Sequence, residues 1–157
     1  MTISKKISTN LTILLFLCFL NCKNTQKSIE NDNTKKIEFS LTTTSCYGTC
    51  PVFTFEIYTD GNASYIGEKH VDLEGSYNAK LDEKDRTALF NMLGEINYFE
   101  MKLKNDFTVK DLPTKYFYAS IGDKESKITY YSPKSESMDE LYELVNKIIR
   151  ETNWIKS

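Results

Sequence analysis

A pair of cysteines separated by three residues carries the most distinctive chemistry in the sequence. The segment reads Cys46-Tyr47-Gly48-Thr49-Cys50-Pro51. Two cysteines at this spacing could form a structural disulfide, exchange disulfides with another protein, or supply two ligands of a metal ion. The surrounding sequence determines which of these uses is favoured.

Thiol–disulfide exchange is the less favoured use of this pair. Exchange enzymes usually carry C-x-x-C at a helix N-terminus, where the helix dipole stabilises the thiolate. Here the spacing is C-x-x-x-C, and the alternation after Pro51 predicts a strand instead of a helix. We therefore expect a structural disulfide between Cys46 and Cys50, and exchange at the same pair remains the alternative.

Acidic residues and the single histidine form a second group of candidate ligands. Glu68, His70, Asp72 and Glu74 occur at every other position, so on one continuous strand they would share a face and could hold a metal. A turn near His70 would scatter them, and the sequence leaves both arrangements open. A solvated strand face is the commoner explanation for such residues. No metal site and no cofactor are therefore predicted.

Tyrosines on predicted strands offer a surface for binding. The dipeptide Asp60-Gly61 predicts a hairpin with a two-residue loop. Such a loop pairs Phe55 with Ile66, which places Tyr58 and Tyr65 together on the opposite face. Tyrosine is favoured at interfaces because its side chain is amphipathic and loses little entropy on binding.

A later strand adds two more tyrosines to this predicted binding face. Tyr116 and Tyr118 alternate with Phe117, so they point away from the side on which Phe117 lies. If the strands are neighbours, the outer face of the sheet is rich in tyrosine. The predicted binding face consists of Tyr58, Tyr65, Tyr116 and Tyr118.

The elements that position these residues follow from hydrophobic periodicity. Alternating apolar residues predict four strands between Ile37 and Leu81 and two more between Lys115 and Tyr131. Helical spacing predicts one helix after Asp82 and a last helix that begins at a capping box at Ser137. The order ββββ-α-ββ-α indicates an α+β fold, with an antiparallel sheet and two helices packed on one face.

The N-terminal segment has the layout of an export signal. Two lysines precede the apolar run 11–20, which is too short for a membrane span of about 20 residues. Leu20-Asn21-Cys22 resembles a bacterial lipobox, which implies cleavage before Cys22 and acylation of its thiol. We expect a signal peptide at 1–21, a lipid-anchored flexible tether at 22–36 and one domain at 37–157. With Cys18 removed and Cys22 acylated, the other two cysteines have only each other as partners.

Composition excludes several classes of protein. The chain has 157 residues, of which 40% are hydrophobic and 27% charged, as in ordinary globular domains. The formal net charge is −2, whereas nucleic-acid binding requires a strongly basic face. No nucleic-acid partner is therefore expected.

Several short motifs resemble those of a family of uncharacterised bacterial envelope proteins, many of them predicted lipoproteins. Members share Cys-aromatic-Gly-x-Cys-Pro, then Asp-Gly and a Tyr-x-Gly strand, which correspond here to 46–51, 60–61 and 65–67. The later Asp111-Leu112-Pro113 is also similar. The resemblance implies one exported domain of unknown function and no particular activity or site.

These features together favour a binding protein over an enzyme. The single histidine leaves no second base for a dyad, and no serine stands in a G-x-S-x-G elbow. We expect a lipid-anchored protein of the bacterial cell envelope, at the outer membrane on its periplasmic or surface side. Its expected partners are the membrane, through Cys22, and an envelope protein, peptide or polymer.

Overall fold

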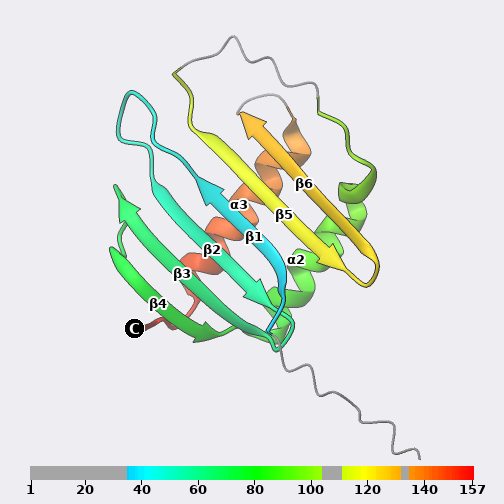
Figure 1. Cartoon of the computed structure of the whole chain (residues 1–157), viewed down its shortest axis with the longest axis horizontal. Helices are drawn as coiled ribbons and strands as arrows, with labels where there is room; N and C mark the ends of the chain where they lie inside the picture. Colours follow the sequence, from blue (N-terminus) through cyan, green and yellow to red (C-terminus); the bar gives the residue numbers. More distant parts are fainter. Residues whose placement is uncertain (1–34, 104–110, 132–134) are drawn as a thin grey trace, which may run out of the picture. The chain divides into compact units, whose positions relative to one another are not determined.

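The computed structural model describes residues 35–103, 111–131 and 135–157 (Figure 1). The predicted signal peptide, most of the tether and Cys22 lie outside these residues. The elements in chain order are β1 (Ile37–Thr43), β2 (Val52–Tyr58), β3 (Asn62–Lys69), β4 (Gly75–Lys80), α2 (Glu83–Glu95), η2 (Tyr98–Glu100), β5 (Thr114–Ile121), β6 (Lys124–Tyr131), α3 (Glu136–Glu151) and β7 (Ile155–Lys156).

Seven strands of the described residues form one antiparallel sheet in the order β6-β5-β1-β2-β3-β4-β7. With two α-helices, the fold is of the α+β class, as the sequence predicts. The predicted element order is wrong at its end, because β7 follows α3. Trp154 packs on side chains of β2 and β3. The residues after it therefore lie next to β4, where Tyr77 pairs with Lys156.

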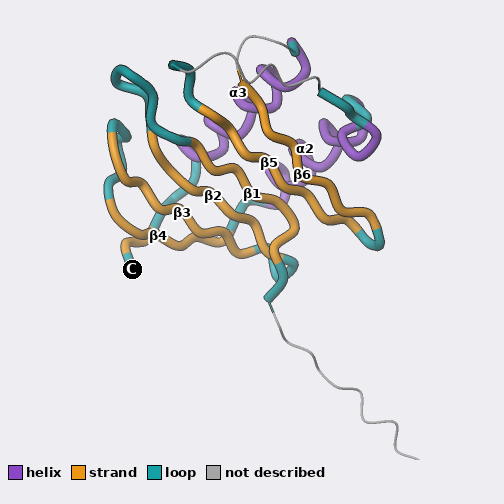
Figure 2. Tube along the Cα trace, turned by 45° about the horizontal axis from the view of Figure 1, so that its top comes forward, coloured by secondary structure: helices purple, strands orange, loops and turns teal. Residues whose placement is uncertain are grey.

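The core lies on the face of the sheet that the helices cover. Figures 1 and 2 show α2 and α3 on the same side of the strands. Alternate residues of the central strands are buried there, as the period of two requires. The fully or almost fully buried apolar residues include Phe39, Leu41, Phe53, Phe55, Ile57, Phe117, Ala119, Leu89, Leu93, Met138, Leu141, Val145 and Ile148.

Side-chain caps begin both helices. Asp82 caps α2 as predicted, because its side chain accepts a hydrogen bond of 2.8 Å from the backbone N–H of Lys84. The predicted start of the last helix is wrong by two residues. Ser135, and not Ser137, caps α3 and accepts a hydrogen bond from the backbone N–H of Met138. None of the helices in the described residues is long and apolar enough to cross a membrane.

The β2–β3 turn changes the pairing that the sequence predicts. The loop has three residues, 59–61, because Gly61 adopts a left-handed conformation with φ of 73°. Phe55 is therefore the partner of Tyr65 and not of Ile66. A shift of one residue moves every side chain of a strand to the other face. Tyr65 consequently faces the helices, where only 3% of it is exposed.

Candidate functional site

Cys46 and Cys50 form a disulfide, as the sequence predicts, with their Cα atoms 5.7 Å apart. The loop that they close connects β1 to β2. Thr43 holds the base of this loop, because its hydroxyl donates to the carbonyl of Pro51 (2.8 Å) and accepts from the N–H of Phe53 (3.1 Å). The cysteines precede a strand, so the loop lacks the helix N-terminus that stabilises a reactive thiolate.

The disulfide loop 46–50 and the Asp111-Leu112-Pro113 motif lie at the same end of the sheet. Thr44, just before the disulfide loop, donates from its N–H to the carbonyl of Thr114 (3.0 Å). The N–H of Thr114 in turn donates to the hydroxyl of Thr44 (3.0 Å). These bonds bring the segment 111–113 beside the loop 46–50, although about 60 residues separate them in sequence.

The predicted tyrosine face exists only in part. Tyr58, Tyr116 and Tyr118 lie on the face of the sheet opposite the core, and Tyr116 is 46% exposed. The prediction that Tyr65 lies on this face is wrong, because the three-residue β2–β3 loop shifts the register of β3 by one residue. Tyr58 is engaged locally, because its hydroxyl donates to Glu56 (2.5 Å) and the Nζ atom of Lys35 lies 3.7 Å from its ring. Burial and the neighbouring Glu56 raise the pKa of Tyr58.

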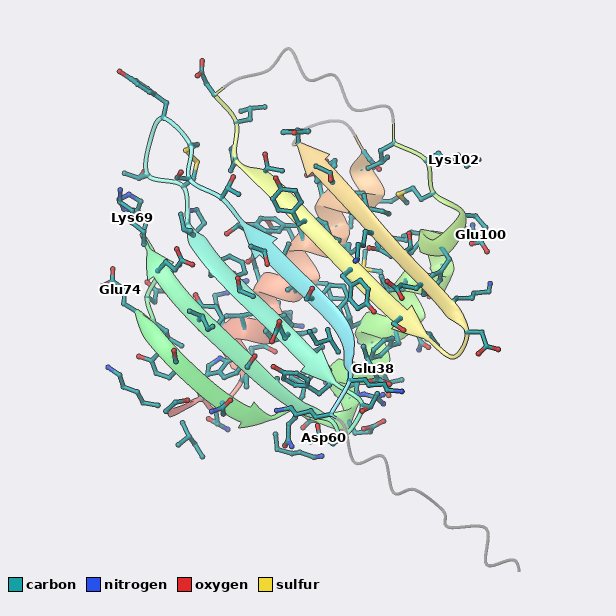
Figure 3. The ribbon with its side chains drawn as sticks, in the orientation of Figure 1. Glu38, Asp60, Lys69, Glu74, Glu100 and Lys102 are labelled. Carbon is teal, nitrogen blue, oxygen red and sulfur yellow. A yellow bond between two sulfur atoms is a disulfide. The ribbon has the colours of Figure 1, made fainter. Side chains whose placement is uncertain are left out.

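The acidic residues around His70 do not share a strand face. β3 ends at Lys69, His70 adopts a positive φ of 56°, and β4 begins only at Gly75. Figure 3 labels Lys69 and Glu74 on either side of this turn, at the opposite end of the strands from Asp60. No group of three or more histidine, cysteine or acidic residues in the described ranges is placed to hold a metal ion.

A pocket of about 810 Å³ lies on the helix side of the sheet, between the β3–β4 turn and the C-terminal half of α3. We call it the aromatic pocket, because five rings line it: Phe53, Tyr65, Tyr77, Tyr142 and Trp154. Its volume lies in the range of small-molecule binding sites, and such sites combine apolar walls with a few polar groups.

Four of the five rings of the aromatic pocket are connected through Tyr65. The centroid of Tyr65 lies 5.6 Å from that of Phe53, 6.4 Å from that of Tyr77 and 5.6 Å from that of Trp154. Trp154 is held in place because its Nε1–H donates to the carbonyl of Ile149 (2.9 Å). These are the separations at which aromatic side chains stabilise one another. We call these four connected rings the floor of the pocket.

Polar side chains from two separate segments surround this floor. His70 and Asp72 belong to the β3–β4 turn, whereas Arg150 and Asn153 belong to the end of α3 and the residues after it. Within the described part of the chain, these four side chains take part in no hydrogen bond or ion pair. Their polar atoms are therefore available to a ligand.

Tyr65 stays protonated at neutral pH. Burial raises the pKa of Tyr65 to about 12, and the nearby carboxylate of Asp72 acts in the same direction. Burial also raises the pKa of Tyr142. The floor of the pocket is thus uncharged, and charge is confined to its rim.

The comparison with protein families identifies the chain. The family model described as a domain of unknown function, DUF6438, matches residues 35–151. The chain belongs to this family. Neither the curated proteins nor the solved structures yielded a match. The DUF6438 match covers nearly all of the sheet and both α-helices, so every wall of the aromatic pocket except residues 152–154 comes from the family's domain.

Sequence reasoning did not find the aromatic pocket of this DUF6438 domain. Its residues come from two segments, 51–77 and 142–154, that lie far apart in the chain. The available signal was Trp154, the only tryptophan, placed directly after a helix and large enough to cover a sheet. The second obstacle was the two-residue loop expected from the sequence. It gave β3 a register that placed Tyr65 on the wrong face of the sheet.

Proposed function

We propose that this protein is a non-catalytic binding module whose ligand occupies the aromatic pocket. The observation that carries the proposal is an aromatic floor with four polar side chains at its rim that form no hydrogen bond or ion pair with the described residues. Binding sites combine apolar surface with a few polar groups that fix the orientation of the ligand.

The aromatic pocket is a better binding site than the open face of the sheet. On the open face, Tyr118 pairs across the sheet with Ser40 and Tyr116 with Thr42, so polar side chains of β1 separate these tyrosines from Tyr58. The pocket instead gathers its aromatic side chains around a concavity of about 810 Å³. A concave site removes more ligand surface from water than a flat face does.

Substitutions at the rim test the binding site. We expect Arg150→Ala and Tyr77→Ala each to weaken binding by at least about tenfold, because each removes a pocket contact. Emission of Trp154, the single tryptophan of the chain, reports binding when protein-free extracts of the cell envelope, which add no tryptophan emission, are mixed with the full chain.

One matched control lies in α3, and the other lies on the open face of the sheet. Lys147→Ala removes a cation of α3 outside the pocket lining, and Tyr116→Ala removes an exposed strand tyrosine on the open face. Both should bind as the parent does. If Tyr116→Ala loses binding and Arg150→Ala does not, the ligand binds at the tyrosine face of the sheet and not in the aromatic pocket.

The proposed location is the bacterial cell envelope, with the chain lipid-anchored at Cys22. The supporting features are the basic and apolar residues of 1–21, the lipobox-like segment before Cys22, and a disulfide of the kind that forms in oxidising compartments. The tether at 22–36 would let the domain reach ligands away from the membrane, on the periplasmic or surface side of an outer membrane.

Mass spectrometry of the chain purified from membranes tests the anchor. We expect residues 1–21 to be absent and Cys22 to carry acyl chains, because two or more chains are needed for stable attachment. The Cys22→Ser variant should leave the membrane fraction. A variant that stays in that fraction, or an unmodified Cys22, would contradict the proposal.

Thiol–disulfide exchange at Cys46 and Cys50 is the competing function. Its support is that both cysteines are partly exposed, so another thiol could reach the bridge. The strand that follows them offers no dipole to stabilise a thiolate, which makes exchange the weaker candidate.

A further inference from the structure

The floor of the aromatic pocket suits a ligand that presents a flat array of C–H groups. The faces of aromatic rings carry negative charge density and attract weakly positive hydrogen atoms. Tyr77 and Trp154 provide such rings, because both are half-buried and both contact the buried ring of Tyr65. The faces of pyranose sugars expose C–H groups of this kind, and their hydroxyls project outward around the ring.

The rim of the pocket matches those hydroxyls. Arg150 only donates hydrogen bonds, the carboxylate of Asp72 only accepts them, the amide of Asn153 does both, and His70 supplies two ring nitrogens. A sugar hydroxyl also donates and accepts, so it can bond to every member of this set. None of the four side chains forms a hydrogen bond or ion pair with another described residue, so a ligand has to displace only water from them.

The charges of the rim favour a neutral ligand. Asp72 and Arg150 are the charged residues of the described pocket lining, one of each sign. A polyanion would require a cluster of cations, as phosphate-binding surfaces do. A polycation would require a cluster of carboxylates.

A peptide fits this pocket less well, because its main chain would find no sheet edge there. Peptides commonly bind by adding a strand to a free edge. Phe53, Tyr65 and Tyr77 lie on β2, β3 and β4, and each of these strands has partners on both sides. At β4 the outer edge is taken by β7, and the N–H of Ser157 donates to the carbonyl of Ser76 (2.9 Å).

We infer that the ligand of the aromatic pocket is a neutral glycan, with its sugar rings on Tyr77 and Trp154 and its hydroxyls bonded to the rim. The inference rests on the proposed function of the pocket as a binding site. It adds the chemical class of the ligand.

Titration with defined saccharides tests the inference. The full chain is held in a detergent without a sugar headgroup, and the probes are chitotetraose, cellotetraose, maltotetraose and, for comparison, tetra-alanine. We expect at least one saccharide to shift the emission of Trp154 with a Kd below about 1 mM, and tetra-alanine to have no effect. Asp72→Asn, which replaces an acceptor-only group, should weaken that binding by about fivefold or more.

The control for Asp72→Asn is Asp123→Asn, an exposed aspartate in the β5–β6 turn and outside the pocket lining. It should leave saccharide binding unchanged. If tetra-alanine binds and no saccharide does, the pocket remains the binding site and the glycan inference is overturned. If no probe and no envelope fraction changes the emission, the proposed function itself fails. Saccharide binding that is insensitive to Asp72→Asn would also overturn the inference, since the sugar would then lie elsewhere.

Discussion

Replacing Gly67 with alanine is expected to destabilise the domain by about 3 kcal/mol. A Cβ atom at this position would lie 1.8 Å from the carbonyl oxygen of Leu73 and 2.8 Å from Cγ2 of Val71. The first of these contacts is with backbone, so a side-chain rotation cannot relieve it. The β3–β4 turn must move, and with it Val71–Leu73, which line the aromatic pocket. We therefore expect ligand binding to weaken along with stability.

Gly94→Ala is the matched control for this substitution. Gly94 lies in α2, and a Cβ atom there would meet nothing within 4 Å. Alanine is favoured over glycine in helices, so this variant should be more stable by about 0.5–1 kcal/mol. Urea unfolding followed by the emission of Trp154 measures both changes. An unchanged midpoint for Gly67→Ala would show that the turn does not pack against Gly67, whereas failure of that variant to fold would agree with the expected clash.

Removing the disulfide should lower the free energy of unfolding by about 2 kcal/mol. The bridge closes a loop of five residues, and the chain-entropy model assigns about this amount to a loop of that length. The double variant Cys46→Ser/Cys50→Ser is expected to keep its fold, because the hydrogen bonds of Thr43 to Pro51 and Phe53 still close the base of the loop. Denaturant unfolding of the oxidised parent and the double variant measures the difference.

The same pair of proteins separates a structural bridge from an exchange site. A structural bridge predicts that the oxidised parent does not accelerate the reduction of insulin by dithiothreitol, and that the double variant binds its ligand as the parent does. Faster reduction of insulin by dithiothreitol in the presence of the parent, but not in the presence of the double variant, would establish thiol–disulfide exchange. The comparison therefore decides between the two candidate functions of the cysteine loop.

The Thr43→Val variant cannot replace the double cysteine variant in this comparison. It removes the hydrogen bonds at the base of the loop and leaves the disulfide intact. The hydroxyl of Thr43 satisfies both the carbonyl of Pro51 and the N–H of Phe53. Its loss would leave buried backbone groups without partners, which is costly for a reason unrelated to the bridge. The cysteine variants keep these bonds and so isolate the contribution of the covalent link.

The sequence by itself determined the features that depend on local interactions. Alternating apolar residues located the six strands before α3, and the spacing of Leu89 and Leu93 located the core-facing side of α2. The cap at Asp82 and the disulfide likewise involve neighbours close in sequence. Such features follow from the period of each element and from short-range hydrogen bonds.

Tertiary structure decided the face of Tyr65, the strand after α3 and the pocket. The conformation of Gly61 set the loop length of one hairpin, and because side chains alternate, one extra loop residue reversed the faces of β3. Trp154 packs against Phe55 and Tyr65, although about 90 residues or more separate them in sequence. No local pattern records which distant segments pack together, since that choice depends on the shape of the whole core. The candidate binding site exists only where those segments meet.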